Sequence, residues 1–215
     1  MECCQADGIE ELMGPRMASG DLRRYRRRGP DKTTRRLLDA IIGEGVEGKN
    51  LLDIGGGVGV LQHELLKAGV KEAASVDASS AYLKAAQDEA KSQGHPDQIK
   101  QFHGDFVELA GEITNADIVT LNRVICCYDD MEKLVELSAQ KAEMIYGVVY
   151  PPDHWLLKTL VRLEDLNHRI KRSQFRTFVH PTAAVEALIQ DAGFERYYSH
   201  DNLFWQIHVY RRPSI

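Results

Sequence analysis

The residues with the clearest chemical meaning lie in one short run, 51–59, which reads Leu-Leu-Asp-Ile-Gly-Gly-Gly-Val-Gly. Two apolar residues lead into Asp53, glycines crowd a turn, and a segment typical of a helix begins at Val60. This order predicts a strand, a tight turn and a helix, where the backbone can approach a nucleotide-like ligand closely. Because the Asp53 carboxylate would repel a pyrophosphate but can hold an ammonium group, the turn suits a ligand with a cationic amino-acid portion and no phosphates.

A dinucleotide is the alternative ligand for such a turn, because its fingerprint is also rich in glycine. When G-x-G-x-x-G/A is laid on Gly55 and Gly57, its last position falls on Val60, which does not fit. An NAD(P)-dependent oxidoreductase therefore remains a less favoured class, and failure to bind a nicotinamide cofactor would exclude it.

Four segments in order resemble the cofactor-binding motifs of the class I S-adenosylmethionine-dependent methyltransferases. They are 53–59, with the pattern D-x-G-x-G-x-G, then 73–77, 102–106 and 116–122. The resemblance implies S-adenosyl-L-methionine as the cofactor, with its ribose hydroxyls on Asp77, its adenine amino group on Asp105 and its adenine ring against Phe106. The cofactor-binding residues that we expect are Asp53, Gly55, Gly56, Gly57, Gly59, Asp77, Ala78, Asp105, Phe106 and Asn122.

The elements that would position these residues alternate along the chain, which predicts a parallel sheet with helices on both faces. Strands are expected near 49–54, 72–76, 98–103, 116–122 and 144–149, and helices near 31–42, 59–68, 79–94, 105–110 and 130–141. A helix from Pro181 to Gly193 follows. Two last strands, 194–199 and 203–210, have a connection too short for a crossover helix, so they must pair antiparallel. We expect an α/β, Rossmann-like, doubly wound seven-stranded sheet, mostly parallel with an antiparallel C-terminal hairpin.

Composition and length are typical of one globular domain. The chain has 215 residues, of which 43% are hydrophobic and 27% charged, and its net charge is −5. No apolar run approaches the roughly 20 residues that cross a membrane, and the polar first residues do not resemble a signal peptide, so we expect a cytoplasmic protein. We expect a flexible N-terminus at 1–20 and one methyltransferase domain at 21–215.

The four cysteines form two adjacent pairs, Cys3-Cys4 and Cys126-Cys127. Neither a disulfide framework nor a C-x-x-C zinc motif has this spacing. Free thiols are therefore expected and no metal site is predicted. A soft metal held by Cys3-Cys4 is the alternative to a disordered chain end.

The segment 16–36 concentrates positive charge in a chain that is acidic overall. Its basic residues are Arg16, Arg23, Arg24, Arg26, Arg27, Arg28, Lys32, Arg35 and Arg36, against only Asp21 and Asp31. Because arginine binds carboxylates and phosphates through two parallel hydrogen bonds, we expect 21–45 to cap the site and favour an anionic acceptor. A solvated basic face is the alternative, and the acidic remainder of the chain disfavours nucleic acid.

The segment 150–180 is longer than a simple connection, and such insertions often cover active sites. An additional packing helix, with Trp155 and Leu160 on its apolar side, is the alternative. The acceptor contacts that we expect are Arg123, Tyr128, His154, Trp155 and Arg172, with His180 as a further candidate.

Direct methyl transfer needs little covalent help, because positioning the reactants supplies much of the acceleration. A general base is required only for an acceptor that must lose a proton. Weak candidates are Tyr128, Cys127, Asp129 and Tyr25, each with a structural role as the alternative.

Within the superfamily, the chain most resembles the magnesium-protoporphyrin O-methyltransferases, through the core, the segment 123–130 and the final hairpin. Tyr25 corresponds to the tyrosine in that family's N-terminal segment. That family carries His-Tyr-Pro where this chain has Cys127-Tyr128-Asp129, so a porphyrin is not the favoured acceptor. We expect methyl transfer to a small-molecule acceptor, anionic or aromatic. A protein that binds S-adenosylmethionine or S-adenosylhomocysteine without catalysis is the alternative, and turnover distinguishes the two.

Overall fold

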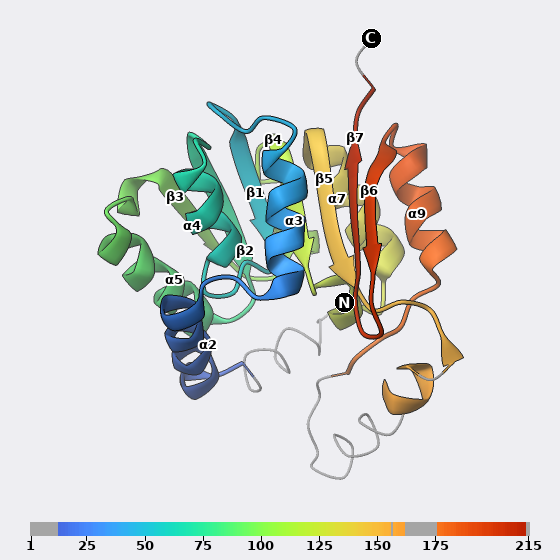
Figure 1. Ribbon diagram of the computed structural model, residues 1–215, viewed down its shortest axis with the longest axis horizontal. Helices are drawn as coiled ribbons and strands as arrows, with labels where there is room; N and C mark the ends of the chain where they lie inside the picture. Colours follow the sequence, from blue (N-terminus) through green and yellow to red (C-terminus); the bar gives the residue numbers. More distant parts are fainter. Residues whose placement is uncertain (1–12, 156, 162–175, 214–215) are drawn as a thin grey trace.

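The computed structural model describes residues 13–155, 157–161 and 176–213. These residues form a seven-stranded sheet with the strand order β3-β2-β1-β4-β5-β7-β6 (Figure 1). The strands are β1 Asn50–Ile54, β2 Glu72–Asp77, β3 Ile99–His103, β4 Ala116–Asn122, β5 Ala142–Tyr150, β6 Glu195–Asp201 and β7 Gln206–Arg211. The first five pair in parallel, whereas β7 is antiparallel to both β5 and β6. The expected fold class is confirmed.

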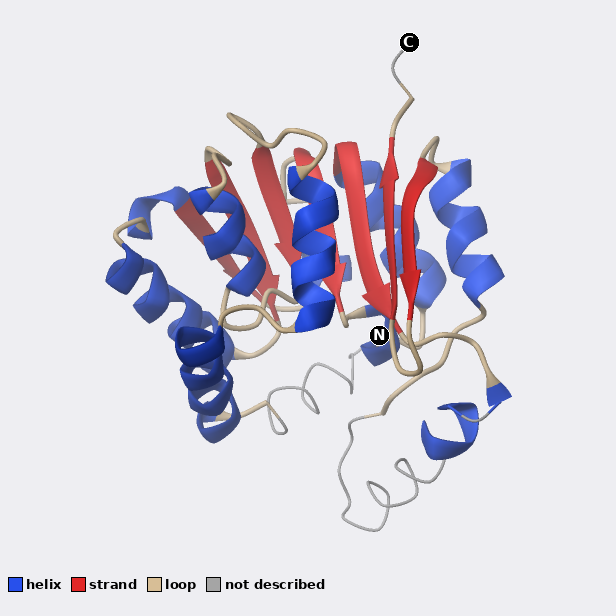
Figure 2. Ribbon diagram, viewed as in Figure 1, coloured by secondary structure: helices blue, strands red, loops and turns tan. Residues whose placement is uncertain are grey.

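Helices cover both faces of this sheet (Figure 2). They are α2 Pro15–Arg28, α3 Lys32–Ile42, α4 Val60–Lys67, α5 Ser80–Gln93, α6 Phe106–Leu109, α7 Met131–Lys141 and α9 Thr182–Asp191, with short 3-10 turns η1 Pro96–Gln98 and η2 Ile125–Cys127. None of the helices within the described ranges is long and apolar enough to cross a membrane.

Local chemistry explains where several helices begin. The carboxylate of Asp31 accepts hydrogen bonds from the backbone amides of Thr33 and Thr34 at 2.9 and 3.2 Å, which caps α3. Ser79 caps α5 in the same way through the amide of Tyr82. Capping leaves the apolar residues of each helix free to pack on the sheet.

Two apolar cores lie on opposite faces of the sheet. One includes Leu37, Ile41, Leu61 and Leu65 of α3 and α4, packed on β1, β5 and β7. The other includes residues of α7 and α9, packed on β4, β5 and the far side of β1. Helices on both faces are typical of a parallel sheet, and the parallel strands β1 to β5 all end at the same edge.

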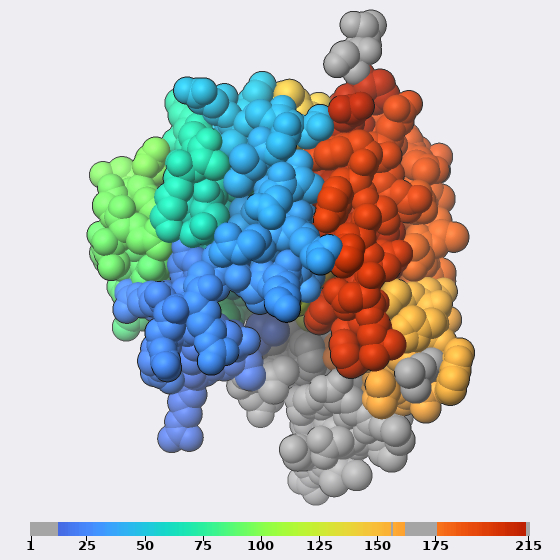
Figure 3. All heavy atoms as spheres, in the orientation of Figure 1, coloured from blue at the N-terminus to red at the C-terminus, as the bar shows by residue number. Residues whose placement is uncertain are grey.

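That edge lies next to α2 in Figure 1. Helix α2 packs beside α5, where Tyr82 donates a hydrogen bond to Asp21 and Arg26 forms an ion pair with Glu89. In Figure 3 the N-terminal segment (blue) and the C-terminal hairpin (red) share one face of the molecule. Helix α2 and the turn between β6 and β7 therefore flank this edge, whereas β7 runs from it to the opposite edge.

Three details differ from the sequence prediction or lie beyond it. Helix α2 begins at Pro15, inside the segment that we expected to be flexible. The hairpin turn is Asn202–Trp205 rather than 200–202, because the Asn202 side chain accepts hydrogen bonds from the amides of Phe204 and Trp205 and removes them from the ladder. Cys3-Cys4, Arg172 and much of the 150–180 insertion lie outside the described residues.

Candidate functional site

A cavity of about 720 Å³ opens at the carboxyl edge of the sheet. Most of the expected cofactor residues line it, namely Asp53, Gly55, Gly56, Gly57, Asp77, Ala78, Phe106 and Asn122. Tyr25, Arg123, Cys127 and Tyr128 line it as well. Gly59 and Asp105 do not line it, although each is the capping residue directly before a helix whose first residue does. The sequence motifs therefore converge on one space, as parallel strands that end together require.

The glycine loop forms the floor of this cavity. Gly55, Gly57 and Gly59 have φ values of 65°, 57° and 82°, a region that glycine adopts without steric cost. Gly56 has a different role, because an added Cβ would lie 2.2 Å from Nε2 of Gln62 and 2.9 Å from Oδ2 of Asp53. The loop packs so closely on the polar groups beneath it that no side chain fits there.

Asp77, the last residue of β2, binds the backbone of the glycine loop. Its carboxylate accepts hydrogen bonds from the amide of Gly57 at 2.9 Å and from the amide of Ser79 at 2.8 Å. The end of β2 is thereby fixed to the glycine turn after β1, so this side chain shapes the cavity as well as lining it.

Asp53 is buried beneath the loop, between two neighbouring strands. In the register of the sheet it lies opposite Ser75 of β2 and Thr120 of β4. The Thr120 hydroxyl and the Gln62 amide donate hydrogen bonds to its carboxylate at 2.7 and 3.1 Å. Burial raises the pKa of Asp53 to about 6; the two hydrogen bonds oppose this shift, and the nearby Asp77 carboxylate adds to it.

This pKa predicts how the binding of a cationic ligand should depend on pH. Below pH 6 the Asp53 carboxyl is protonated and neutral, and above it the carboxylate attracts an ammonium group. We therefore expect the affinity for S-adenosylhomocysteine to rise between pH 5 and pH 7 by more in the native protein than in Asp53→Asn. Calorimetric titrations across this range test it, and the same pH profile in both proteins would contradict the role of Asp53.

Asp105 begins α6 and connects it to the segment after β4. Its Oδ1 atom accepts hydrogen bonds from the amide of Val107, at 2.8 Å, and from the hydroxyl of Tyr128. The backbone carbonyl of Tyr128 in turn contacts Nε2 of His180 at 2.7 Å. His180 thus lies behind the wall and supports a cavity residue. The expected contact of Asp105 with adenine stays a prediction.

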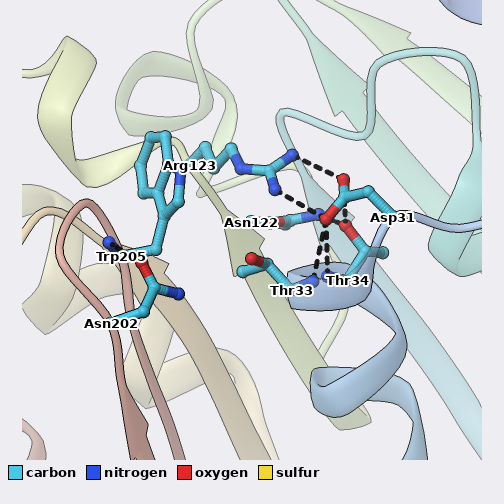
Figure 4. A network of polar contacts seen from close by, with 7 residues as sticks. All are labelled: Asp31, Thr33, Thr34, Asn122, Arg123, Asn202 and Trp205. Atoms are coloured by element: carbon cyan, nitrogen blue, oxygen red, sulfur yellow. Dashed lines mark hydrogen bonds and ion pairs between the residues drawn. The ribbon is translucent and has the colours of Figure 1, made fainter.

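Arg123 follows β4 directly and lines the cavity, and Figure 4 shows its side chain between Asp31 and Trp205. Its two terminal nitrogens donate to the two carboxylate oxygens of Asp31 at 3.0 and 2.9 Å. Its guanidinium carbon lies 5.0 Å from the centre of the Trp205 ring. The neighbouring Asn122 donates to the Thr34 hydroxyl at 3.1 Å. Three distant parts of the chain therefore meet at the end of β4.

The catalytic candidates Tyr25 and Cys127 line the cavity, but their polar atoms have protein partners. The Tyr25 hydroxyl donates to Glu64 of α4 at 2.7 Å, and burial is the main cause that raises its pKa. The Cys127 thiol contacts the carbonyl oxygen of Arg123 at 3.8 Å. Cys126 and Cys127 are free thiols, as expected.

We expected His154 and Trp155 to contact the acceptor, but neither residue lines this cavity. His154 contacts the carbonyl oxygen of Leu203 and accepts from the amide of Leu157 at 3.3 Å, so it fastens residues 157–161 to the hairpin. Trp155 is 76% exposed. Strand β5 ends at Tyr150, immediately before Pro151 and Pro152, because a proline cannot donate a backbone hydrogen bond to the sheet.

Sequence reasoning missed the residues that support Asp53 from neighbouring elements. Ser75 and Thr120 interrupt otherwise apolar strands, and Gln62 is a buried polar residue of α4. A polar residue at the same height in adjacent buried strands is a signal that could have found the first two. Asp31 and Tyr82, which also line the cavity, lie outside the four segments that resemble cofactor-binding motifs.

Comparisons with known proteins agree with this geometry. Residues 52–140 match the family described as a methyltransferase domain. Ribosomal protein L11 methyltransferase of Alteromonas mediterranea is 28% identical over 145 residues, which are 65% of this chain. The match covers 47% of that relative, so the chain spans about half the length of the curated protein it matches.

Solved structures share the whole fold. The crystal structure of magnesium protoporphyrin IX methyltransferase from Synechocystis PCC 6803 with bound SAH superposes with a TM-score of 0.70 at 18% identity, covering 95% of this chain and 98% of that one. An O-methyltransferase family protein from Burkholderia thailandensis gives a TM-score of 0.69 at 15% identity, covering 93% and 60%. The matched segment contains the glycine loop, and the likeness to the solved structures extends over the sheet, so residues 52–140 resemble a methyltransferase domain and the whole described fold is that of these methyltransferases.

Proposed function

We propose that the protein transfers the methyl group of S-adenosylmethionine to a small anionic acceptor. One observation carries the proposal: the glycine loop and a set of cationic side chains line the same cavity. These cations are Arg24, Arg28, Lys32 and Arg123. The volume, about 720 Å³, is within the roughly 300–1,000 Å³ of small-molecule sites.

The residues present fit the cofactor. The buried carboxylate of Asp53 suits its ammonium group, and Asp77 suits its ribose hydroxyls. Asn122 lines the cavity, and its buried amide oxygen has no hydrogen-bond partner within the described part of the chain. Such an orphaned acceptor favours a ligand that donates to it. Phe106, buried beside the cavity, supplies an apolar surface for the adenine.

The chemistry that the cofactor supplies is a methyl group on an activated sulfonium. The protein has to bind the acceptor, orient its nucleophilic atom and exclude water. Arg28 and Lys32 form no ion pair with the residues that the structure describes, so their charges are available at the mouth of the cavity. An acceptor that is already anionic, such as a carboxylate, needs no general base, which agrees with the occupied polar atoms of Tyr25 and Cys127.

Calorimetric titration with S-adenosylmethionine, S-adenosylhomocysteine and NAD tests the cofactor. We expect micromolar or tighter affinity for the first two and no binding of NAD. Binding of NAD alone would instead indicate a nicotinamide-dependent oxidoreductase. Incubation with radiolabelled S-adenosylmethionine and a panel of aromatic carboxylic acids then distinguishes a transferase from a protein that only binds the cofactor.

A further inference from the structure

We propose that Arg123 binds the carboxylate of the acceptor and that Asp31 occupies its place when no acceptor is present. This inference rests on the proposed function and names the group that the site recognises. It explains why an arginine at the wall of a cofactor cavity is already paired, through both terminal nitrogens, with a carboxylate of the protein itself (Figure 4).

The backbone at Arg123 indicates a functional position. Among the described residues other than glycine, Arg123 is the one with a positive φ, at 66°. Such a conformation is costly for a residue with a Cβ, and it persists where the surroundings impose it, commonly at binding sites. Here the amide of Arg123 donates to the carbonyl of Val149 at 2.8 Å, which ties the turn to β5. The strained turn directs the side chain along the cavity wall.

The guanidinium is arranged as a receptor for a planar anion. The ring of Trp205 lies on it at 5.0 Å and restricts its orientation. Its Nε atom is buried and has no hydrogen-bond partner within the described residues. An arginine that is held in place and retains an unused donor suits a carboxylate, which takes two parallel hydrogen bonds.

Asp31 can release this arginine without losing its own role. Its carboxylate also accepts from the amides of Thr33 and Thr34 and from the Thr34 hydroxyl at 3.1 Å. These bonds keep α3 capped when Arg123 turns to another anion. The ion pair is solvent-accessible, with Arg123 32% and Asp31 47% exposed, and exposed pairs contribute little net stability. An acceptor carboxylate can therefore replace Asp31 on Arg123 at little cost in free energy.

Trp205 gives a direct spectroscopic reading of this exchange. The chain has two tryptophans, so Trp155→Phe leaves Trp205 as the single emitter beside the guanidinium. In this background, benzoate is titrated against the neutral benzamide, with and without S-adenosylhomocysteine. We expect a saturable change in emission with benzoate and none with benzamide.

Three further variants in the Trp155→Phe background test the roles of Arg123 and Asp31, with Arg27 as the control. Arg123→Gln should weaken benzoate binding by about tenfold or more, because charge-assisted bonds are lost. Asp31→Asn keeps a good helix cap but removes the competing charge, so it should bind benzoate about two- to fivefold more tightly. Arg27→Gln removes an exposed α2 charge that does not line the cavity, and it should behave like the parent.

Equal responses to benzoate and benzamide, or unchanged benzoate binding in a folded Arg123→Gln, would overturn the assignment of Arg123. Unchanged affinity in Asp31→Asn would overturn the competition. Failure of the proposed function is a separate outcome: it appears as no binding of S-adenosylhomocysteine by calorimetry, whereas the benzoate titration without it still reports on Arg123.

Discussion

Gly56→Ala is expected to lower the free energy of unfolding by about 1–3 kcal/mol, the usual cost of overpacking a filled site. The methyl group would lie 2.2 Å from Nε2 of Gln62, 2.8 Å from the Ser75 hydroxyl and 2.9 Å from Oδ2 of Asp53. All three side chains are buried, and Gln62 is bonded to both of the others, so the network cannot move aside without losing hydrogen bonds. Urea unfolding measures the effect.

The same substitution should reduce the affinity for S-adenosylhomocysteine by about tenfold or more, because the displaced loop forms the cavity floor. Gly20→Ala is the matched control. An added Cβ at Gly20 meets nothing within 4 Å, and the residue lies inside α2, where alanine is favoured by about 0.5–1 kcal/mol. A Gly56→Ala protein as stable as the native one would show that the loop is less tightly packed than its geometry indicates.

Asp77→Ala is expected to weaken cofactor binding by about 1–3 kcal/mol, which is roughly five- to 150-fold in affinity. Two causes act together. The proposed bonds to the ribose are lost, and the amides of Gly57 and Ser79 lose their acceptor, which loosens the loop. Asp77→Asn keeps one acceptor oxygen, so its affinity for S-adenosylhomocysteine should lie between those of the native protein and Asp77→Ala. Calorimetric titration with S-adenosylhomocysteine measures all three proteins.

Asp88→Ala serves as the control for Asp77, because Asp88 lies exposed on α5 and does not line the cavity. Its affinity should equal that of the native protein. If a folded Asp77→Ala binds S-adenosylhomocysteine as tightly as Asp88→Ala does, the carboxylate has no part in the site.

The meeting of Asp53, Asp77 and Asn122 at one edge of the sheet could be predicted, because each lies at or next to the end of a parallel strand. Asp53 and Asp77 follow apolar runs whose period gives their height in the sheet, and parallel strands end at one edge. The register then places Thr120 and Ser75 beside Asp53. The positions of Thr120 and Ser75 beside Asp53 were not predicted, because the register between two strands cannot be read from the sequence of one strand alone.

The positions of the residues that we expected to contact an acceptor were predicted less well, for a physical reason. His154 and Trp155 were chosen from their distance to a strand end, but their place depends on how Pro151 and Pro152 direct the chain and on the contact of His154 with Leu203. Asp31 was expected only as the first residue of a helix near 31–42, and its bond to Arg123 joins it to a residue 92 positions away. Contacts between loops of this kind leave no periodic pattern in a sequence.

The contact of Trp205 with Arg123 has a consequence for biosynthesis. Strand β5 pairs with β7, Tyr197 of β6 binds the carbonyl of Ala40 in α3, and Trp205 comes from the turn between β6 and β7. A ribosome releases these residues after those of the glycine loop, and a domain generally folds as a unit. The single sheet can therefore close, and Trp205 can reach Arg123, only after the hairpin has left the exit tunnel.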